Sequence, residues 1–296
     1  MKRTGYLAPE GLEKALLGEL KNVERQVGRL IIAQGENQEV YWAQNIWRDL
    51  EIIPFDSIGN GAKKLRAMNG LWVLYPHENI RRSKLIQEKL PFFSPKPLSF
   101  PATLPKSRLG SWTLLDANTL IASPNCSSLV PNGEYHFLET KEPPSRAYLK
   151  LWEAFTRLGR APKSGELCLE LGASPGSWSW VLSALGAKVI AVDKAPLAKD
   201  FSNVQFLKKD AFQIMPNDFP QVRWVFSDLI CYPEKLLSWI QLWLEMGSKA
   251  NFICTLKFQG EEHYAAIAEF KKIHGCQIMH LFHNKHELTF VLIHDA

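Results

Sequence analysis

The chain has 296 residues, of which 46% are hydrophobic and 22% are charged, a composition typical of a soluble globular protein with one or two domains. No apolar run approaches the roughly 18–20 residues that a membrane helix needs, and Glu10 and Glu13 stand where a signal peptide would be apolar, so we expect a cytoplasmic protein. The net charge of +5 arises in residues 1–150, which hold 20 Lys and Arg against 15 Asp and Glu, and this mild positive bias suits a polyanionic partner.

The first 90 residues alternate helix-like and strand-like stretches, which predicts a small α+β domain. The expected elements are helices at 11–20 and 78–90, a short helix or loop at 57–70, and strands at 28–34, 39–44 and 71–77. The basic residues of this region form either a surface that binds an RNA backbone or only a solvated helix face. They are Lys63, Lys64, Arg66, Arg81, Arg82, Lys84 and Lys89.

The next stretch is rich in proline, with five prolines in residues 91–105, which predicts an extended connection. Residues 110–123 are expected to form short strands or turns. We therefore predict a first domain at 1–90, a Pro-rich linker with connecting strands at 91–143, and a second domain at 144–296.

The second domain begins with an amphipathic helix at 145–159, for which Ser145 is a candidate N-cap. Buried strands then alternate with helices, which predicts a doubly wound α/β domain with a mostly parallel sheet and helices on both faces. The last two stretches, 276–284 and 286–295, predict a hairpin at the sheet edge. The other expected strands are 166–172, 187–196, 204–212, 222–230 and 251–258, and the other expected helices are 175–186, 235–247 and 261–275.

A tight turn with two glycines follows the first strand, in the sequence Gly172-Ala173-Ser174-Pro175-Gly176-Ser177. Such a turn lets the backbone approach a ligand closely at the carboxyl ends of parallel strands. Asp193 ends the next strand, where an acid accepts hydrogen bonds from ribose hydroxyls, and Asp210 follows the third strand, where it can accept from an adenine amino group. The alternative for both acids is a helix N-cap or loop carboxylate.

A dinucleotide cofactor would require G-x-G-x-x-G, which this turn lacks, so a smaller adenosyl cofactor fits better. The turn and the aromatic Trp178 resemble the motif G-x-x-P-G-G-aromatic of the FtsJ-like (RrmJ-type) RNA 2′-O-methyltransferases, with Ser177 in place of the second glycine. The chain resembles most the bacterial 23S rRNA (cytidine 2′-O) methyltransferase M group, strongly over 144–296 and weakly over 1–90.

The family carries a Lys-Asp-Lys-Glu tetrad, and four residues match it in the right order: Lys150, Asp228, Lys257 and Glu287. The resemblance further implies a THUMP-like RNA-binding domain at the N-terminus and S-adenosylmethionine as cofactor. The residues expected to bind this cofactor are Ser145, Gly172, Ser174, Pro175, Gly176, Ser177, Trp178, Asp193, Asp210 and Asp228.

Methyl transfer to a ribose hydroxyl needs a group that removes the hydroxyl proton while the hydroxyl is held in line with the methyl. We predict that Lys257 is this general base, that Asp228 orients it, and that Lys150 and Glu287 are positioning groups. At its ordinary pKa of about 10.4, a lysine is protonated at neutral pH and is therefore a poor general base. A second ammonium group nearby lowers the pKa of a lysine. Surface ion pairs are the alternative interpretation of these four residues.

Three functions remain open at this point. The first is rRNA 2′-O-methylation, the second is methylation of a small molecule or protein, and the third is RNA binding by a catalytically silent relative. The expected partner is 23S rRNA, and the protein is expected to be a monomer. The five cysteines show no CxxC spacing, and His283 and His286 lack partners at metal-ligand spacing, so no disulfide or metal site is predicted. Four tryptophans are expected in the core, namely Trp178, Trp180, Trp239 and Trp243.

Overall fold

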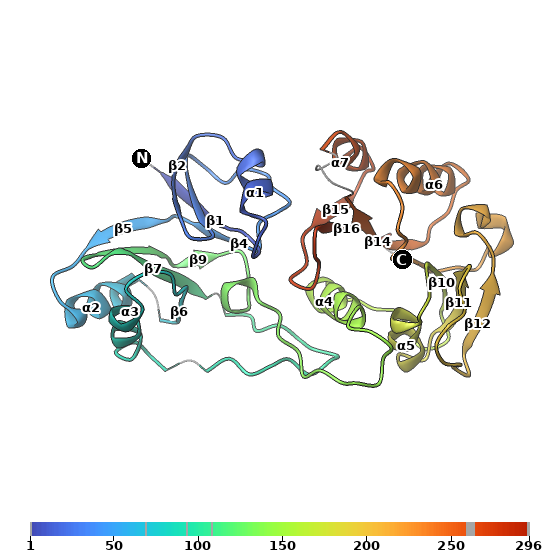
Figure 1. Cartoon of the computed structure of the whole chain (residues 1–296), viewed down its shortest axis with the longest axis horizontal. Coiled ribbons are helices and arrows are strands. Elements are labelled where there is room, and N and C mark those ends of the chain that lie inside the picture. Colours follow the sequence, from blue (N-terminus) through green and yellow to red (C-terminus); the bar gives the residue numbers. More distant parts are fainter. Residues whose placement is uncertain (1, 69, 93, 108, 259–263, 295–296) are drawn as a thin grey trace. The chain divides into compact units, whose positions relative to one another are not determined.

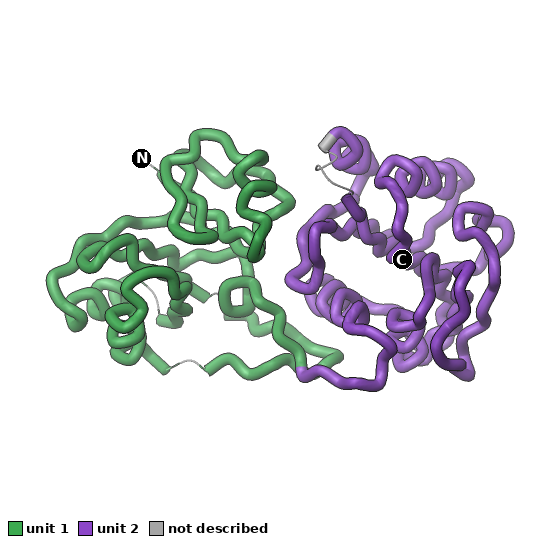
Figure 2. The backbone as a smooth tube through the Cα atoms, viewed as in Figure 1, with its two compact units in different colours: residues 1–137 green, residues 138–296 purple. Residues whose placement is uncertain are grey.

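The computed structural model describes residues 2–68, 70–92, 94–107, 109–258 and 264–294. The chain divides into two compact units, residues 1–137 and 138–296 (Figure 2).

The N-terminal unit contains two sheets (Figure 1). One has the strand order β2-β3-β1-β4-β9, and the other has the order β5-β8-β7-β6. The strands are β1 (Arg3–Leu7), β2 (Val23–Val27), β3 (Leu30–Gln34), β4 (Asn45–Arg48), β5 (Glu51–Pro54), β6 (Trp72–Leu74), β7 (Gly110–Asp116), β8 (Thr119–Ser123) and β9 (Asn125–Cys126), and the helices are α1 (Glu13–Glu19), α2 (Ile58–Met68) and α3 (Ile80–Gln87).

This unit extends beyond the boundary that we predicted at residue 90. The β7–β8 hairpin pairs with β5 through β8 and with β6 through β7, so the strands after the Pro-rich stretch complete a sheet that began before it. The backbone hydrogen bonds of β5 and β6 require these later strands. The part of 91–143 that we predicted as connecting strands therefore belongs to the first unit up to Phe137.

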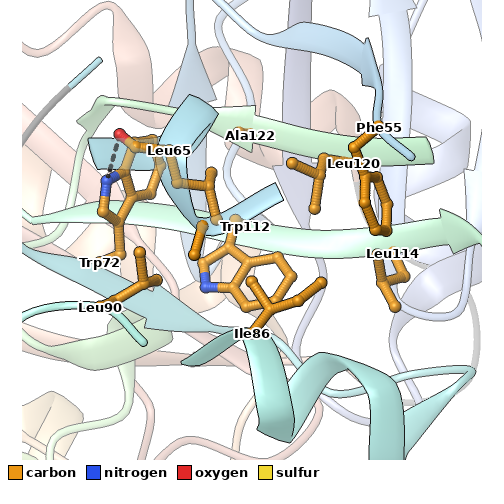
Figure 3. Packing of buried hydrophobic residues seen from close by; sticks show 10 residues of the cluster. Phe55, Leu65, Trp72, Ile86, Leu90, Trp112, Leu114, Leu120 and Ala122 are labelled. Atoms are coloured by element: carbon orange, nitrogen blue, oxygen red, sulfur yellow. Dashed lines mark hydrogen bonds between the residues drawn. The ribbon is translucent and has the colours of Figure 1, made fainter. Parts of the chain in front are cut away.

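The core of the second sheet is built around Trp72 and Trp112, which are fully buried beside Leu65 and Ile86 of the two helices (Figure 3). The indole N–H of Trp72 donates to the Leu65 carbonyl at 2.9 Å, which satisfies its polar atom within the core. The helices α2 and α3 are thereby fixed on this sheet, and they carry the basic residues singled out in the sequence.

One strand prediction in this unit was wrong. Residues 39–44 form no strand, and β4 begins only at Asn45. The backbone N–H groups of Tyr41 and Trp42 donate to the carboxylate of Glu19, at 2.9 and 3.1 Å, so a side chain takes the place of a strand partner. A pattern of alternating residues cannot distinguish these two ways of satisfying the backbone.

The C-terminal unit is a seven-stranded sheet of order β12-β11-β10-β13-β14-β16-β15. The strands β10 to β14 are parallel, whereas β16 runs antiparallel between β14 and β15, so the predicted hairpin is present. The strands are β10 (Leu167–Leu171), β11 (Lys188–Asp193), β12 (Val204–Lys208), β13 (Trp224–Ser227), β14 (Asn251–Lys257), β15 (Cys276–Met279) and β16 (Glu287–Leu292).

Helices cover both faces of this sheet, with α4 and α5 on one face and α6 and α7 on the other (Figure 1). No helix among the described residues has the length and apolarity needed to cross a membrane. The first three residues of the helix predicted at 261–275 lie outside the described residues. The helices are α4 (Tyr148–Leu158), α5 (Ser177–Ala184), α6 (Pro233–Glu245) and α7 (Tyr264–Lys271).

Candidate active site

The predicted site residues gather at one edge of the C-terminal sheet. Asp193 and Lys257 end β11 and β14, and Asp228 follows β13, so the parallel strands deliver all three to their common carboxyl edge. Glu287 instead opens its strand. Because β16 is antiparallel to β14, its first residue lies at the same edge, where Glu287 is the cross-strand partner of Lys257.

The four residues matched to the tetrad form one ion-pair cluster. Lys150 Nζ, from α4, lies 2.6 Å from Glu287 Oε1 and 3.2 Å from Asp228 Oδ1. Lys257 Nζ lies 3.0 Å from Asp228 Oδ1 and donates to the Asp228 backbone carbonyl at 2.6 Å. The side chains retain only 9–20% exposure. They are therefore not the surface ion pairs of the alternative interpretation.

The charges within this cluster balance, with two ammonium groups against two carboxylates. Burial alone would lower the pKa of Lys150, but the charges of Asp228 and Glu287 and their hydrogen bonds outweigh it, so that the pKa of Lys150 is raised. The expectation that a neighbouring ammonium lowers the lysine pKa does not hold for Lys150, because two carboxylates contact it directly. Lys150 stays protonated at neutral pH and suits a positioning role.

The glycine turn between β10 and α5 has the backbone that its sequence predicts. Gly172 and Gly176 have φ angles of +76° and +107°, in the region that favours glycine. A Cβ at Gly172 would lie 3.0 Å from the backbone nitrogen of Leu229, so the turn also needs the absent side chain. Pro175 is exposed, and the Ser174 N–H donates to Asp193 Oδ2 at 3.0 Å.

Ser177, which replaces the second glycine of the family motif, is buried and holds Ser145. Its hydroxyl lies 2.8 Å from the Ser145 hydroxyl and accepts the Ser145 N–H at 3.0 Å. The predicted N-cap role of Ser145 was wrong, because the cap position of α4 is Ala147. The side chain of Trp178 is buried, as we expected of a core residue, and its indole donates to the Ala147 carbonyl at 2.9 Å. The predicted contact of Trp178 with the cofactor stays a prediction.

A first pocket of about 410 Å³, here called the Asp193 pocket, contains both acids predicted to contact the cofactor. Both oxygens of Asp193 accept backbone N–H groups, from Ser174 at 3.0 Å and Ala195 at 2.9 Å. Asp210 accepts the Phe212 N–H at 3.0 Å and pairs with Lys194 at 2.9 Å. The hydrogen bond from Lys194, followed by that from Phe212, lowers the pKa of Asp210. Both acids thus have the loop contacts of the alternative interpretation and also line a pocket.

A second pocket of about 900 Å³, here called the Lys257 pocket, lies beside the cluster. Lys150, Lys257 and Glu287 line it together with Ser145 and Arg146. The loop between β15 and β16 supplies four further lining residues, Phe282, His283, Lys285 and His286. Exposed Ile230 lines both pockets, so they adjoin at this residue.

Sequence reasoning missed a buried acid on α4. Glu153 is completely buried, pairs with Arg157 at 2.6 Å, and accepts the backbone N–H groups of Phe282 and His283 at 2.8 and 3.0 Å. Burial raises the pKa of Glu153 against the opposing effect of Arg157. The signal was available, since Glu153 and Arg157 stand three and seven residues after Lys150 on one helix face.

A second missed acid lies beneath the glycine turn. Glu170, in β10, is buried, and the Ser179 hydroxyl donates to it at 2.5 Å. Burial, with smaller contributions from the charges of Asp228 and Asp193, raises the pKa of Glu170 to about 8. A lone acid in an apolar strand, followed by a serine nine residues later, gives no helical or strand spacing from which this pair could be predicted.

Other features of the described residues lie away from this edge. A cavity of about 450 Å³ lies beside Arg223 and Lys249, which precede β13 and β14 at the opposite edge of the sheet. No group of three or more His, Cys, Asp or Glu among the described residues could hold a metal ion, and none of the five cysteines forms a disulfide. Trp239 and Trp243 are buried as expected, and both donate to the Ile214 carbonyl.

Comparisons with known proteins agree with the resemblance stated from the motif. Residues 143–283 match the family model of the FtsJ-like methyltransferases. The ribosomal RNA large subunit methyltransferase M of Idiomarina loihiensis is 30% identical over 51% of this chain and 46% of its own length. That of Pseudomonas aeruginosa is 28% identical over 57% of this chain and 53% of its own length. The chain thus spans about half the length of the curated relatives it matches.

Solved structures align with this chain at lower sequence identity than these relatives do. The fibrillarin pre-rRNA processing protein of Methanococcus jannaschii aligns with 45% of this chain and 68% of its own, at 19% identity and a TM-score of 0.35. TrmN from Thermus thermophilus aligns over the full length of both chains, at 15% identity and a TM-score of 0.37. The family match confirms the predicted resemblance to the FtsJ-like methyltransferases for residues 143–283 of the C-terminal unit.

Proposed function

We propose that the protein transfers a methyl group from S-adenosylmethionine to a ribose 2′-hydroxyl of large-subunit rRNA, a cytidine of 23S rRNA. The observation that carries this proposal is the buried cluster of Lys150, Asp228, Lys257 and Glu287, three of which line a pocket that adjoins the Asp193 pocket at Ile230. One pocket suits an adenosyl cofactor and the other suits a polyanionic acceptor. The names of the M-type relatives support the choice of rRNA.

The Asp193 pocket fits the cofactor by the chemistry of its donors and acceptors. Each carboxylate oxygen has two acceptor sites, so Asp193 still has one per oxygen for ribose hydroxyls after its two backbone contacts. Asp210 would accept from the adenine amino group. When bound, S-adenosylmethionine supplies a methyl group on a positively charged sulfur. The turn from Gly172 to Ser177, with Asp228, would hold the remainder of the cofactor.

The cluster has the parts that proton removal from a hydroxyl requires. Lys257 would accept the hydroxyl proton, and its contacts with the Asp228 side chain and carbonyl fix the direction of its amine. Lys150 remains charged and orients Asp228 from the other side. Glu287 balances the charge of Lys150, and Asp228 balances the positive charge that the neutral amine of Lys257 acquires when it takes the hydroxyl proton.

We also propose that the N-terminal unit docks RNA rather than taking part in chemistry. Arg81, Lys84 and Lys89 of the α3 region are exposed, as is Lys63 of α2. Arg82 is partly buried over the Phe55 ring, at 5.2 Å, and suits a structural role better. Such exposed cations contribute to RNA affinity through counterion release.

A methyl-transfer assay with labelled S-adenosylmethionine tests the proposal. In vitro transcribed 23S rRNA should accept the label, whereas proteins and small molecules of a cell extract should not. Mapping of 2′-O-methyl groups on the labelled transcript should find one alkali-resistant position. Label in the protein fraction alone would support the alternative, a methyltransferase for a small molecule or protein. Cofactor binding without transfer would indicate a catalytically silent relative.

A further inference from the structure

The loop at residues 280–286 forms one wall of the Lys257 pocket and is held in place by several hydrogen bonds. Four of its side chains line the pocket. At its base, Glu153 accepts the N–H groups of Phe282 and His283, and Arg157 donates to the His280 carbonyl at 3.3 Å. Within the loop, His280 contacts the Lys285 carbonyl at 3.1 Å. A wall fixed at these points presents its side chains in one arrangement.

The anchor of this loop and the charge cluster share one helix. Glu153 lies three residues after Lys150 on α4, so one rigid element sets the position of both. Glu153 is fully buried, and transferring a carboxylate from water into such a position costs free energy. Deleting the partners of a buried carboxylate costs still more, because an uncompensated charge is left. The buried Glu153–Arg157 pair therefore fixes the loop relative to the reacting edge at an energetic cost, which indicates that the position of the loop matters.

The lining of the pocket indicates the chemistry of its occupant. Among the described lining residues, Arg146, Lys150, Lys257 and Lys285 are basic, and Glu287 is the one acid, which Lys150 already pairs. Lys150 and Lys257 are paired within the cluster and Arg146 pairs with Glu139 at 2.6 Å, so the exposed Arg146 and Lys285 are the lining cations that a phosphodiester of a nucleic acid can reach. The loop adds aromatic and imidazole rings, and unpaired bases stack on such rings.

We propose that loop 280–286 receives the base of an unpaired acceptor nucleotide, and that Glu153 is the positioning residue that holds this loop. The proposal rests on the proposed function and names the form of its substrate. Phe282 contacts the base, and Lys285 with Arg146 contacts the flanking phosphates. The acceptor enters single-stranded because a pocket of about 900 Å³ lined by rings takes one nucleotide out of its stack.

The first test compares Phe282→Ala and Phe282→Trp, with 23S rRNA transcript as substrate. Loss of one stacked base should raise KM by about fivefold or more for Phe282→Ala, whereas Phe282→Trp keeps a ring and should stay near the wild type. The kcat of both should change by less than about threefold. Leu242→Ala, at a partly exposed position of α6 outside both pockets, is the control.

The second test concerns Glu153. Glu153→Gln replaces an acceptor oxygen with an N–H group facing the Phe282 or His283 N–H, so the loop should shift and KM for RNA should rise by about fivefold or more. Cofactor affinity, measured by calorimetry, should stay within about twofold. The double variant with Phe282→Ala should be no worse than the stronger single variant, because both act through one loop.

The third test uses the methylation site once it is mapped on the transcript. A complementary oligonucleotide annealed across that site should block methylation, whereas one annealed elsewhere should not. Equal KM for wild type and Phe282→Ala, additive effects with Glu153→Gln, or methylation of the annealed site would overturn the inference. A wild-type enzyme that does not methylate the transcript at all would instead overturn the proposed function.

Discussion

The two pockets at the edge of the C-terminal sheet use their charged groups differently. In the Asp193 pocket, backbone N–H groups of Ser174, Ala195 and Phe212 hold the two acids, and one ion pair, from Lys194, is added at Asp210. In the Lys257 pocket, the charged groups are held by one another. The first pocket depends on the course of the backbone, and the second depends on the balance of charge across four distant chain segments.

This difference predicts that the two pockets can be impaired separately. A change in the Asp193 pocket should alter cofactor affinity and leave RNA affinity in place. A change in the charge cluster should alter turnover and leave both affinities in place. The experiments below either break this separation or sharpen it.

The largest effect is expected at Lys257. Lys257→Ala should lower turnover by at least about 100-fold, the usual contribution of a positioned base, while cofactor and RNA binding persist. Lys257→Arg should fail almost as badly, because arginine keeps the charge but does not give up its proton. Single-turnover kinetics and calorimetry measure the two quantities. Near-normal turnover of Lys257→Arg would transfer the base role to another group, with the two pockets unaffected.

A smaller effect is expected at Asp193. Asp193→Ala should weaken cofactor binding by about 1–3 kcal/mol, because it removes acceptors both for the ligand and for the Ser174 and Ala195 N–H groups. Asp193→Asn keeps one acceptor and should lose less. Calorimetry with S-adenosylmethionine gives the affinity, and filter binding with RNA gives the control. Unchanged cofactor affinity in a folded Asp193→Ala protein would exclude Asp193 from the site.

Glu170 should make stability depend on pH. Its pKa in the folded protein is about 8, above the ordinary 4.5, so the folded state binds more protons than the unfolded state between these values. The contribution of protonated Glu170 to the free energy of unfolding is fully present below pH 4.5. It is lost as the pH rises through 8, by about 1 kcal/mol per pH unit. Glu170→Gln, which resembles the protonated acid, should lose less stability than the wild type in thermal unfolding from pH 5 to 8. Parallel curves would show that Glu170 is ionised throughout.

The smallest effect is expected in the N-terminal unit. Arg81→Glu should reduce the dependence of RNA binding on salt by about one released counterion per lost phosphate contact, with turnover at saturating RNA unchanged. Lys188→Glu, at the first residue of β11 and outside both pockets, makes the same charge change as a control. Equal salt slopes for the two variants would identify the α3 cations as an ordinary solvated helix face.

The sequence predicted the C-terminal unit far better than the N-terminal one, for a physical reason. In a parallel sheet, each strand is a buried apolar run and its carboxyl end faces the ligand, so Asp193 was recognisable from local context, and Lys257 from the family tetrad together with its place at a strand end. In the N-terminal unit, β5 pairs with β8 and β6 pairs with β7, some seventy and forty residues later in the chain. Local patterns contain no information on such distant pairing, so the boundary at residue 90 was misplaced.

Within the site, the same distinction separates what was predicted from what was missed. The family motif pointed to Lys150 and Glu287, but the hold of Glu153 on the loop 129 residues later is a contact that only the folded chain reveals. The predicted cap at Ser145 was wrong because α4 begins only after Ala147, and the Ser145 hydroxyl contacts both the Ala147 N–H and Ser177 of a different element. Local propensity describes caps and periodicity, whereas these contacts depend on how α4 packs against α5.

The antiparallel course of β16 has a consequence for the order in which the protein becomes competent. This strand follows all others in the chain, yet it lies between β14 and β15 inside the sheet. Glu287 meets Lys150 only after β16 has inserted, and a register shift of one residue would turn its side chain to the opposite face. A growing chain therefore contains three members of the cluster with a surplus positive charge until its last strand is in place. If the cluster acts as proposed, methyl transfer would therefore require that β16 has taken its place in the sheet.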